Sequence, residues 1–309
     1  MKATRDAYGE TLARLGEENK DIVVLDADLS GSTKTAVFAK KFPERFFNMG
    51  IAEANMVGTA AGLAAVGKIP FVSTFAIFAA GRAWEQIRQS VAYPKANVKI
   101  VPTHGGVTVG EDGGTHQSVE DIAIMRAIPN MTVIVPADAE ETKGAVAAAA
   151  AYKGPVFIRL GRNKVPRVFD EGHGFQIGKG CEIAAGTDLT FVTTGIMTAQ
   201  AMQAATLLAP EGISARVIHI GTVKPLDKEL VLKAARETGA IVTAEEHSII
   251  GGLGSAVSEL LAERQPTPLV RVGIKDRFGT SGKAEELLKY FGLMPEDLVE
   301  AARSVLARK

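Results

Sequence analysis

Short runs rich in β-branched residues alternate with longer helical patterns along most of this chain. In the first half, the apolar runs predict strands at residues 22–25, 45–48, 69–73, 98–101, 132–135 and 156–159. Helical segments lie between them: Tyr8, Leu12 and Leu15 recur at i, i+4 and i+7, and the alanine-rich run 145–151 has high helix propensity. This alternation is typical of parallel strands joined by crossover helices.

A stretch rich in glycine, proline and charge at residues 161–180 interrupts the pattern. The alternation then resumes, with strands at 189–193, 214–220, 240–244 and 269–272, helices at 197–208, 227–238 and 255–264, and a helical tail from 284 onward. A chain of 309 residues is long enough for about two domains. We therefore predict an α/β fold with two doubly wound α/β domains and mostly parallel sheets, at 1–165 and 183–309, joined by a linker at 166–182.

The composition excludes several classes of protein. An apolar fraction of 46% with 23% charged residues is ordinary for a packed globular chain. The 35 basic and 35 acidic residues cancel, and no local basic stripe is present, so we expect no nucleic-acid partner. A single cysteine, Cys181, excludes a disulfide framework, and no apolar run approaches the ~20 residues of a membrane span. We expect a cytoplasmic protein with no membrane partner.

Ligands of doubly wound sheets bind outside the carboxyl ends of the strands, so the loops there are the candidate sites. The first such loop, residues 26–32, contains Asp26, Asp28, Ser30 and Ser32. These side chains suit the wall of a polar site, but they also suit a turn and a helix N-cap. Composition alone favours the turn.

Glu53 follows the second predicted strand and has the apolar neighbours Ile51, Met56 and Val57. A carboxylate in such surroundings is costly unless it is paired or protonated. If it is buried, this side chain is a competent proton donor near neutral pH. The alternative is an exposed glutamate in the first turn of a helix, stabilised by the helix dipole.

Two aromatic residues, Phe75 and Phe78, stand one helical turn apart after the strand at 69–73. Such a pair is usually part of a core. Aromatic residues make up only 6% of the chain, however, so their place at the carboxyl end of a strand also suits a ligand site.

The loop at residues 103–117 is the most unusual segment of the sequence. It contains His104, His116, Glu111, Asp112 and five glycines. A structural loop needs turns, whereas a site needs groups that titrate near neutral pH and backbone that can approach a ligand closely. We favour a functional loop. The two histidines are too far apart for the zinc motif of a single helix face, and no thiolate completes a metal site.

A second glycine-rich segment in the other half of the chain carries less information. Glu245-Glu246-His247 precedes Gly251-Gly252-Leu253-Gly254, which resembles a dinucleotide turn only weakly because the third glycine is missing. We interpret this segment as the start of a helix.

Taken together, these segments resemble the carboxyl-terminal half of a transketolase, a family of thiamine-diphosphate enzymes, over essentially the whole chain. The resemblance is strongest at 26–32, 50–62, 73–78 and 103–117. Its most specific part is Gly110-Glu111-Asp112-Gly113-Gly114-Thr115-His116-Gln117, where the family usually has proline in place of Gly114. The resemblance implies a thiamine-diphosphate pyrimidine-binding domain at 1–165 and the transketolase C-terminal domain at 183–309.

The resemblance also implies how the coenzyme is bound. Glu53 would donate a hydrogen bond to the aminopyrimidine ring nitrogen, favouring the imino tautomer that removes the proton from the thiazolium carbon. Phe75 would stack on the aminopyrimidine with Phe78 beside it, and Asp28 would lie near the cofactor. A third aromatic of the family is Gly81 here, so the stack is thinner unless Trp84 substitutes.

The remaining matches concern the substrate. Ser32, His104 and Arg162 match contacts to the sugar phosphate, which suits a cation and hydrogen-bond donors facing a dianion. Asp112 matches the acid that binds a substrate hydroxyl, and His116 matches a catalytic histidine that faces the reaction centre. The implied reaction transfers a two-carbon ketol unit from a ketose phosphate to an aldose phosphate, and the carbanion chemistry belongs to the cofactor.

Full-length relatives carry an earlier domain whose Gly-Asp-Gly…Asn segment holds the metal and the diphosphate, and no such segment is found here. We therefore expect a split transketolase, active only with a partner: an N-terminal transketolase subunit that carries the diphosphate-binding domain and binds most of the Mg²⁺ or Ca²⁺. The active sites would lie at the interface, with two copies of each chain.

Three other interpretations remain open. A deoxyxylulose-phosphate synthase-like enzyme and the beta subunit of a 2-oxo acid dehydrogenase would share the fold and Glu53. The sequences Thr103-His104 and Glu-Asp-Gly-x-Thr-His fit transketolase better. The third is a non-catalytic binding or regulatory module, although every matching acid and imidazole is present.

Overall fold

Seven strands form the first sheet, in the order β12-β6-β7-β5-β4-β2-β3. The structure, a computed structural model, describes residues 1–309. All neighbouring strands in this sheet are parallel except β12 and β6. The bounds are β2 (Ile22–Asp26), β3 (Phe46–Asn48), β4 (Ile69–Ser73), β5 (Lys99–Ile100), β6 (Thr132–Ile134), β7 (Val156–Ile158) and β12 (Thr222–Lys224).

Helices cover both faces of this sheet, because successive side chains of a buried strand point to opposite sides. Val24 packs with α1 (Thr4–Glu18), α3 (Ala36–Lys41) and α8 (Ala139–Ala151). Its neighbours Val23 and Leu25 pack with α4 (Glu53–Ala65), α5 (Ala76–Arg82), α7 (Asp121–Ala127) and the π-helical turn η2 (Ile87–Ala92). Shorter helical elements are α2 (Ser30–Thr33), η1 (Pro43–Arg45), α6 (Trp84–Gln86) and η3 (Val107–Val109).

The second sheet has the order β14-β13-β10-β11-β9 and is parallel except at β9. Its strands are β9 (Cys181–Ala184), β10 (Leu189–Thr193), β11 (Ala215–His219), β13 (Ile241–Ser248) and β14 (Leu269–Ile274). One face is covered by α9 (Met197–Leu208) and α13 (Pro295–Leu306), and the other by α10 (Lys228–Thr238) and α11 (Leu253–Arg264). The turn η4 (Ala209–Glu211) and α12 (Ala284–Tyr290) complete the fold.

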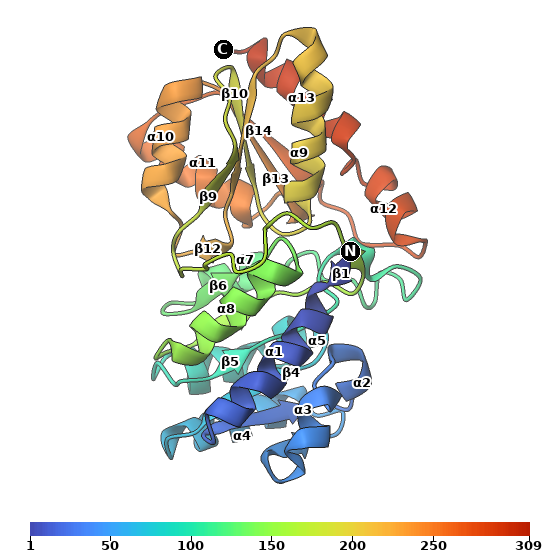
Figure 1. Cartoon of the computed structure of the whole chain (residues 1–309), viewed down its shortest axis with the longest axis vertical. Coiled ribbons are helices and arrows are strands. Elements are labelled where there is room, and N and C mark those ends of the chain that lie inside the picture. The colour runs from blue at the N-terminus through green and yellow to red at the C-terminus, as the bar shows by residue number, and fades with distance from the viewer.

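Figure 1 shows the two sheets one above the other, with the first half of the chain, blue to green, below the second half. The predicted α/β class with mostly parallel sheets is therefore confirmed. No helix has both the length and the apolar character that a bilayer span requires.

Three short strands differ from the sequence prediction. β12 comes from the second half of the chain but pairs antiparallel with β6 of the first sheet. β9 begins at Cys181, inside the segment predicted as a linker. β1 (Lys2–Ala3) pairs antiparallel with β8 (Lys164–Val165), which ties the first residues of the chain to the end of the first half.

The register of the first sheet brings its carboxyl-end loops together. Asp26, the last residue of β2, lies opposite Asn48 at the end of β3 and Ser73 at the end of β4. A parallel bridge between Phe75 and Thr103 then aligns the segments that follow β4 and β5. The loops that contain the predicted site residues therefore share one edge.

Candidate active site at the carboxyl edge of the first sheet

The loop after β2 is organised by a buried carboxylate. Asp26 accepts hydrogen bonds from the Leu29 backbone N–H at 2.6 Å and from the hydroxyls of Thr33 and Thr35 at 2.7 and 2.8 Å. Burial raises the pKa of Asp26. For this residue the turn interpretation holds. Asp28 has a left-handed backbone, with φ +62°, and accepts a bond from Asn48 Nδ2 at 2.9 Å.

Glu53 is the first residue of α4, and it is only 4% exposed. The structure combines the two sequence interpretations: the side chain lies in the first turn of a helix, and it is buried. Its partner is Arg82, from the last turn of α5, whose Nη1 donates to Glu53 Oε1 at 2.8 Å. The buried acid is thus paired with a cation, as the cost of an isolated buried charge requires.

Four rings form one cluster beside this pair: two from the start of α5 and two from the loop after β5. Phe75 stacks on His104, with ring centroids 3.8 Å apart, and on Phe78 at 5.7 Å. His116 meets Phe75 and Phe78 edge-on at 6.2 and 5.5 Å. The Arg82 guanidinium lies 4.0 Å from the centroid of Phe78 and so joins Glu53 to the cluster. Phe75 is buried, and His104 is its nearest ring.

The two histidines of the cluster occupy different environments. His104 is 2% exposed, and its Nδ1 lies 2.7 Å from the Thr103 hydroxyl. Burial lowers the pKa of His104 to about 3, helped by the nearby charges of Arg5 and Arg162. This imidazole is therefore neutral at physiological pH. His116 is half-buried, and its Nδ1 lies 3.0 Å from the Thr115 hydroxyl.

Two arginines lie close together at this end of the site. Arg5, at the start of α1, donates from Nη1 to the Ser32 carbonyl at 2.9 Å, while its Nε is buried without a hydrogen-bond partner. Burial lowers the pKa of Arg5, and the nearby Arg162 contributes. Arg162 pairs with Asp112 at 3.6 Å and donates to the Val109 carbonyl. An unpaired guanidinium N–H beside a second arginine is the donor set that an anionic group binds.

The second sheet supports the loop that contains His104 and His116. Glu246 of β13 accepts the Thr108 backbone N–H at 2.7 Å. Arg159 donates to Asp121 at 2.8 Å, to the Ser118 carbonyl at 3.2 Å and to the Glu246 carbonyl at 2.9 Å. Burial raises the pKa of both Glu246 and its neighbour Glu245. Every member of this network is buried, so it holds the loop rigidly.

A segment between β14 and α12 closes over the same loop. Gln117 Nε2 donates to the Thr280 carbonyl at 2.9 Å and to the Val107 carbonyl at 3.1 Å. The segment approaches so closely that a Cβ at Gly113 would lie 2.5 Å from Ser281 Oγ, and one at Gly114 would lie 2.5 Å from the Gly279 carbonyl. Glycine at position 114 therefore fits a close backbone contact in this chain.

The Glu245 segment behaves as the sequence analysis predicted. Glu245 accepts the backbone N–H groups of Leu253 and Gly254, both at 2.7 Å, at the start of α11. This carboxylate satisfies two of the free donors of a helix N-terminus. The glycine-rich turn is therefore a helix start.

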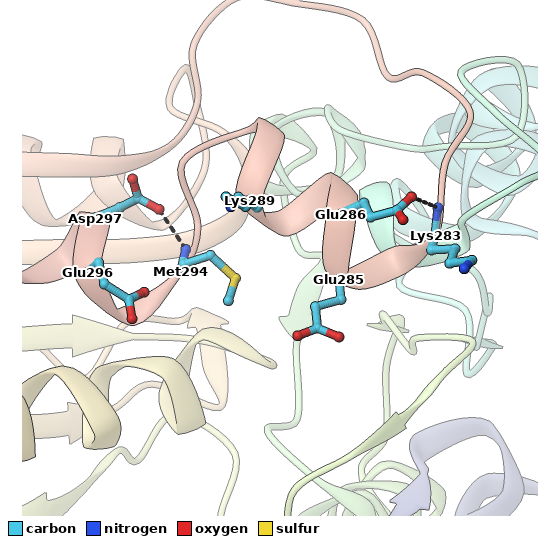
Figure 2. A pocket seen from close by; sticks show the side chains of 7 residues that line it. All are labelled: Lys283, Glu285, Glu286, Lys289, Met294, Glu296 and Asp297. Atoms are coloured by element: carbon cyan, nitrogen blue, oxygen red, sulfur yellow. Dashed lines mark hydrogen bonds between the residues drawn. The ribbon is translucent and has the colours of Figure 1, made fainter.

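Two other features of the structure are not part of this site. No group of three or more His, Cys, Asp and Glu side chains is clustered as a metal ion needs. A cleft of about 840 Å³ lies between α12 and α13 and is lined mostly by charged residues (Figure 2). Glu286 accepts the Lys283 backbone N–H at 3.2 Å, and Asp297 accepts that of Met294 at 2.8 Å, so these two carboxylates cap helices. None of the predicted site residues lines this cleft.

The sequence analysis missed three residues of this region. Arg5 and Arg82 were not singled out, and Glu246 was mentioned only as part of a helix start. Arg82 follows Phe78 by one helical turn, a spacing that indicates a shared helix face. The places of Arg5 and Glu246 follow from the β1–β8 pairing and from the docking of the second sheet, which have no local sequence signal.

Comparison with known proteins identifies the family of the chain. Residues 1–168 match the family model of the transketolase pyrimidine binding domain, and residues 178–298 match that of the transketolase C-terminal domain. The class that fold and site define is the transketolase family, and this chain belongs to it.

The relatives place the chain more narrowly within the family. It is 54% identical over 302 residues to a Methanocaldococcus jannaschii protein named as a transketolase C-terminal section, covering 97% of this chain and 95% of that protein. It is 47% identical to a 6-deoxy-6-sulfo-D-fructose transketolase subunit of a Clostridium species, covering 99% and 95%. A solved structure described as a split gene transketolase, inactive β4 tetramer, superposes with a TM-score of 0.94 at 57% identity, covering 99% of both chains.

Proposed function

We propose that this chain is one subunit of a thiamine-diphosphate-dependent split transketolase, active only with a partner chain. In this proposal the enzyme transfers a two-carbon ketol unit from a ketose phosphate to an aldose phosphate. The observation that carries the proposal is the position of Glu53: a buried carboxyl group at a helix start, linked through Arg82 to a cluster of two phenylalanines and two histidines.

The residues present fit the pyrimidine half of thiamine diphosphate. An aminopyrimidine needs an aromatic face and an acid beside its ring nitrogen, and Glu53 supplies the acid. For the face we propose Phe78 in place of Phe75, because Arg82 joins the Phe78 ring to Glu53, whereas the Phe75 ring is stacked on His104. The ring of Phe75 stacks on that of Phe78, with ring centroids 5.7 Å apart. When bound, the coenzyme would supply the carbanion chemistry of ketol transfer.

Within this proposal the chain's own side chains control protons. Glu53 holds a proton at its carboxyl oxygen and donates it in a hydrogen bond to the ring, which a site shielded from water strengthens. Asp28 would lie near the coenzyme. His116 faces the reaction centre and accepts or returns a proton there.

The same edge of the sheet would bind the sugar. Arg5 and Arg162 supply charge, and Ser32 and neutral His104 supply hydrogen bonds, for a terminal phosphate. Asp112 would exchange its contact with Arg162 for a substrate hydroxyl. The name of the Clostridium relative contains a sugar that carries a sulfonate instead of a phosphate. A sulfonate is also an anion and accepts the same charge-assisted hydrogen bonds. We propose an anionic group at the end of the substrate.

The partner would supply the other part of the active site. We propose a chain with the diphosphate-binding domain, which binds most of the Mg²⁺ or Ca²⁺, and two copies of each chain per assembly. The solved relative supports this, because its tetramer of one kind of chain is described as inactive. We retain 1–165 as the pyrimidine-binding domain, 166–182 as the linker and 183–309 as the C-terminal domain.

The test is reconstitution. The chain is mixed with a partner that carries the diphosphate-binding domain, thiamine diphosphate and Mg²⁺, and ketol transfer between sugar phosphates is compared with decarboxylation of pyruvate. Ketol transfer by the mixture, with none by either chain alone, supports the proposal. Pyruvate decarboxylation without ketol transfer would favour a 2-oxo acid dehydrogenase or a deoxyxylulose-phosphate synthase-like enzyme. Inactivity of a correctly assembled mixture would favour a non-catalytic module.

A further inference from the structure

Arg82 makes two contacts that reach into the candidate site. Its Nη1 donates to Glu53 Oε1 at 2.8 Å, and its guanidinium carbon lies 4.0 Å from the centroid of the Phe78 ring. The Arg82 side chain is 51% exposed, whereas that of Glu53 is 4% exposed. A half-exposed cation therefore reaches inward to a buried acid.

These two contacts are the ones that an aminopyrimidine ring would need. A guanidinium group is planar, stacks on aromatic faces and donates N–H bonds in its own plane. An aminopyrimidine is also planar and stacks on the same kind of face, with its polar edge toward an acid. One face of Phe78 and one oxygen of Glu53 cannot serve both groups at once.

The charges explain why Arg82 takes this position in the free chain. A buried carboxylate without a partner carries a large desolvation cost, and Arg82 is the cation that pairs with Glu53. Arg82 itself keeps much of its contact with water, so its release costs little. The pair is therefore favourable when the site holds no ring, and it is easily exchanged for a ligand that binds Glu53 in its protonated form.

We propose that Arg82 is a positioning residue of the pyrimidine subsite: it occupies the place of the coenzyme ring in the free chain and moves to solvent when the ring binds. This inference rests on the proposed function, because it takes the ring to be that of thiamine diphosphate. It follows that Arg82 lowers the affinity for the coenzyme and keeps the acid paired until coenzyme and partner have both arrived.

The experiment is a calorimetric titration of the reconstituted pair with thiamine diphosphate in the presence of Mg²⁺. Arg82→Met removes the cation and the planar group but keeps an unbranched side chain. We expect this variant to bind thiamine diphosphate about three- to tenfold more tightly than the unmodified pair. This factor corresponds to the free energy of a half-exposed ion pair together with a cation–π contact, which the coenzyme no longer has to displace. Arg88→Met is the matched control, because Arg88 is exposed and bonds only to Gln89. The control should bind like the unmodified pair.

A second variant keeps the proposal testable if Arg82→Met does not fold. Arg82→Lys retains a cation for Glu53 but lacks the planar group that covers Phe78. Its affinity for thiamine diphosphate should therefore lie between that of the unmodified pair and that of Arg82→Met. A purely structural role for Arg82 predicts weaker coenzyme binding in both variants, and equal or weaker binding overturns the inference. If the unmodified pair assembles but binds no thiamine diphosphate, the proposed function fails and this inference fails with it.

Discussion

The backbone N–H of Thr108 donates to the Glu246 carboxylate at 2.7 Å, from a loop of the first sheet to a strand of the second. Thr108 lies between His104 and His116 in the sequence, so this bond anchors the loop that contains both imidazoles. The second domain contributes none of the proposed site residues. Its contribution is to hold the loop in place through Glu246, whose backbone carbonyl also accepts a hydrogen bond from Arg159 of the first domain.

This anchor makes stability depend on pH. Burial raises the pKa of Glu246, so its carboxyl group binds a proton more tightly in the folded chain than in the unfolded chain. The stabilising effect is complete below the ordinary glutamate value of 4.5 and is lost as the pH rises through the raised pKa. Glu246→Gln keeps an acceptor oxygen for Thr108 but does not titrate. In melting curves from pH 4 to 8, we expect the variant to lose less stability than the unmodified chain as pH rises.

The control for this experiment is Glu263→Gln, at an exposed position in α11. Its melting temperatures should follow those of the unmodified chain. If the Glu246→Gln curve ran parallel to both, titration of Glu246 would not contribute to stability.

Gly106 tests how closely the loop fits against the same carboxylate. Its φ is +85°, and a Cβ there would lie 2.5 Å from Glu246 Oε2 and closer still to the other carboxylate atoms. We expect Gly106→Ala to lower the free energy of unfolding by about 3 kcal/mol, from backbone strain and overpacking together. Urea denaturation measures this. Gly174→Ala, where no atom lies within 4 Å of the added Cβ, should change it by well under ~1 kcal/mol.

His104 should stay neutral throughout the physiological range. Its pKa in the folded chain, about 3, lies below the ordinary value of 6.5. Protonation therefore favours the unfolded chain, and His104 makes the protein less stable as the pH falls below about 6.5. In ¹⁵N-edited NMR spectra, the imidazole signals assigned through His104→Gln should not shift between pH 5 and 8. A titration midpoint inside that range would show that the ring is charged while folded.

The anion subsite predicts a substrate-dependent effect for Arg162. Arg162→Met removes one guanidinium beside Arg5, so we expect KM for an aldose phosphate acceptor to rise about 10- to 100-fold, as for the loss of a charge-assisted hydrogen bond. KM for the corresponding unphosphorylated aldose should change little. Arg167→Met, at an exposed arginine that pairs with Asp170, is the control. An equal rise in KM for both acceptors would show that Arg162 lies outside the anion subsite.

The strands and helices with strong local patterns were predicted closely. The strands at 69–73 and 189–193 and the helix at 197–208 agree with β4, β10 and α9 residue for residue. Apolar alternation and helix propensity act over a few neighbouring residues, so these elements are visible in the sequence. β12 has only three residues, and its partner β6 lies some ninety positions earlier, so no local pattern indicates the sheet that it joins.

The site shows the same division between local and long-range information. Phe75, Phe78, His104 and His116 could be expected to meet, because the loops after neighbouring parallel strands share an edge. The pairing of Glu53 with Arg82 joins two residues that are 29 positions apart in the sequence, and it depends on the packing of their two helices. The anchor from Glu246 depends on how one domain docks on the other, which the sequence pattern does not indicate.

The central claim is that the carboxyl group of Glu53 acts on the coenzyme ring in an active site shared with the partner chain. The most direct test is the rate of ketol transfer by the reconstituted pair with Glu53→Gln, an uncharged side chain of nearly the same shape. We expect kcat to fall by about 10²- to 10⁴-fold, the usual contribution of a positioned acid, while size-exclusion chromatography shows unchanged assembly. Glu263→Gln should leave kcat unchanged. A fully assembled Glu53→Gln pair that transfers ketol units at the unmodified rate would contradict the claim.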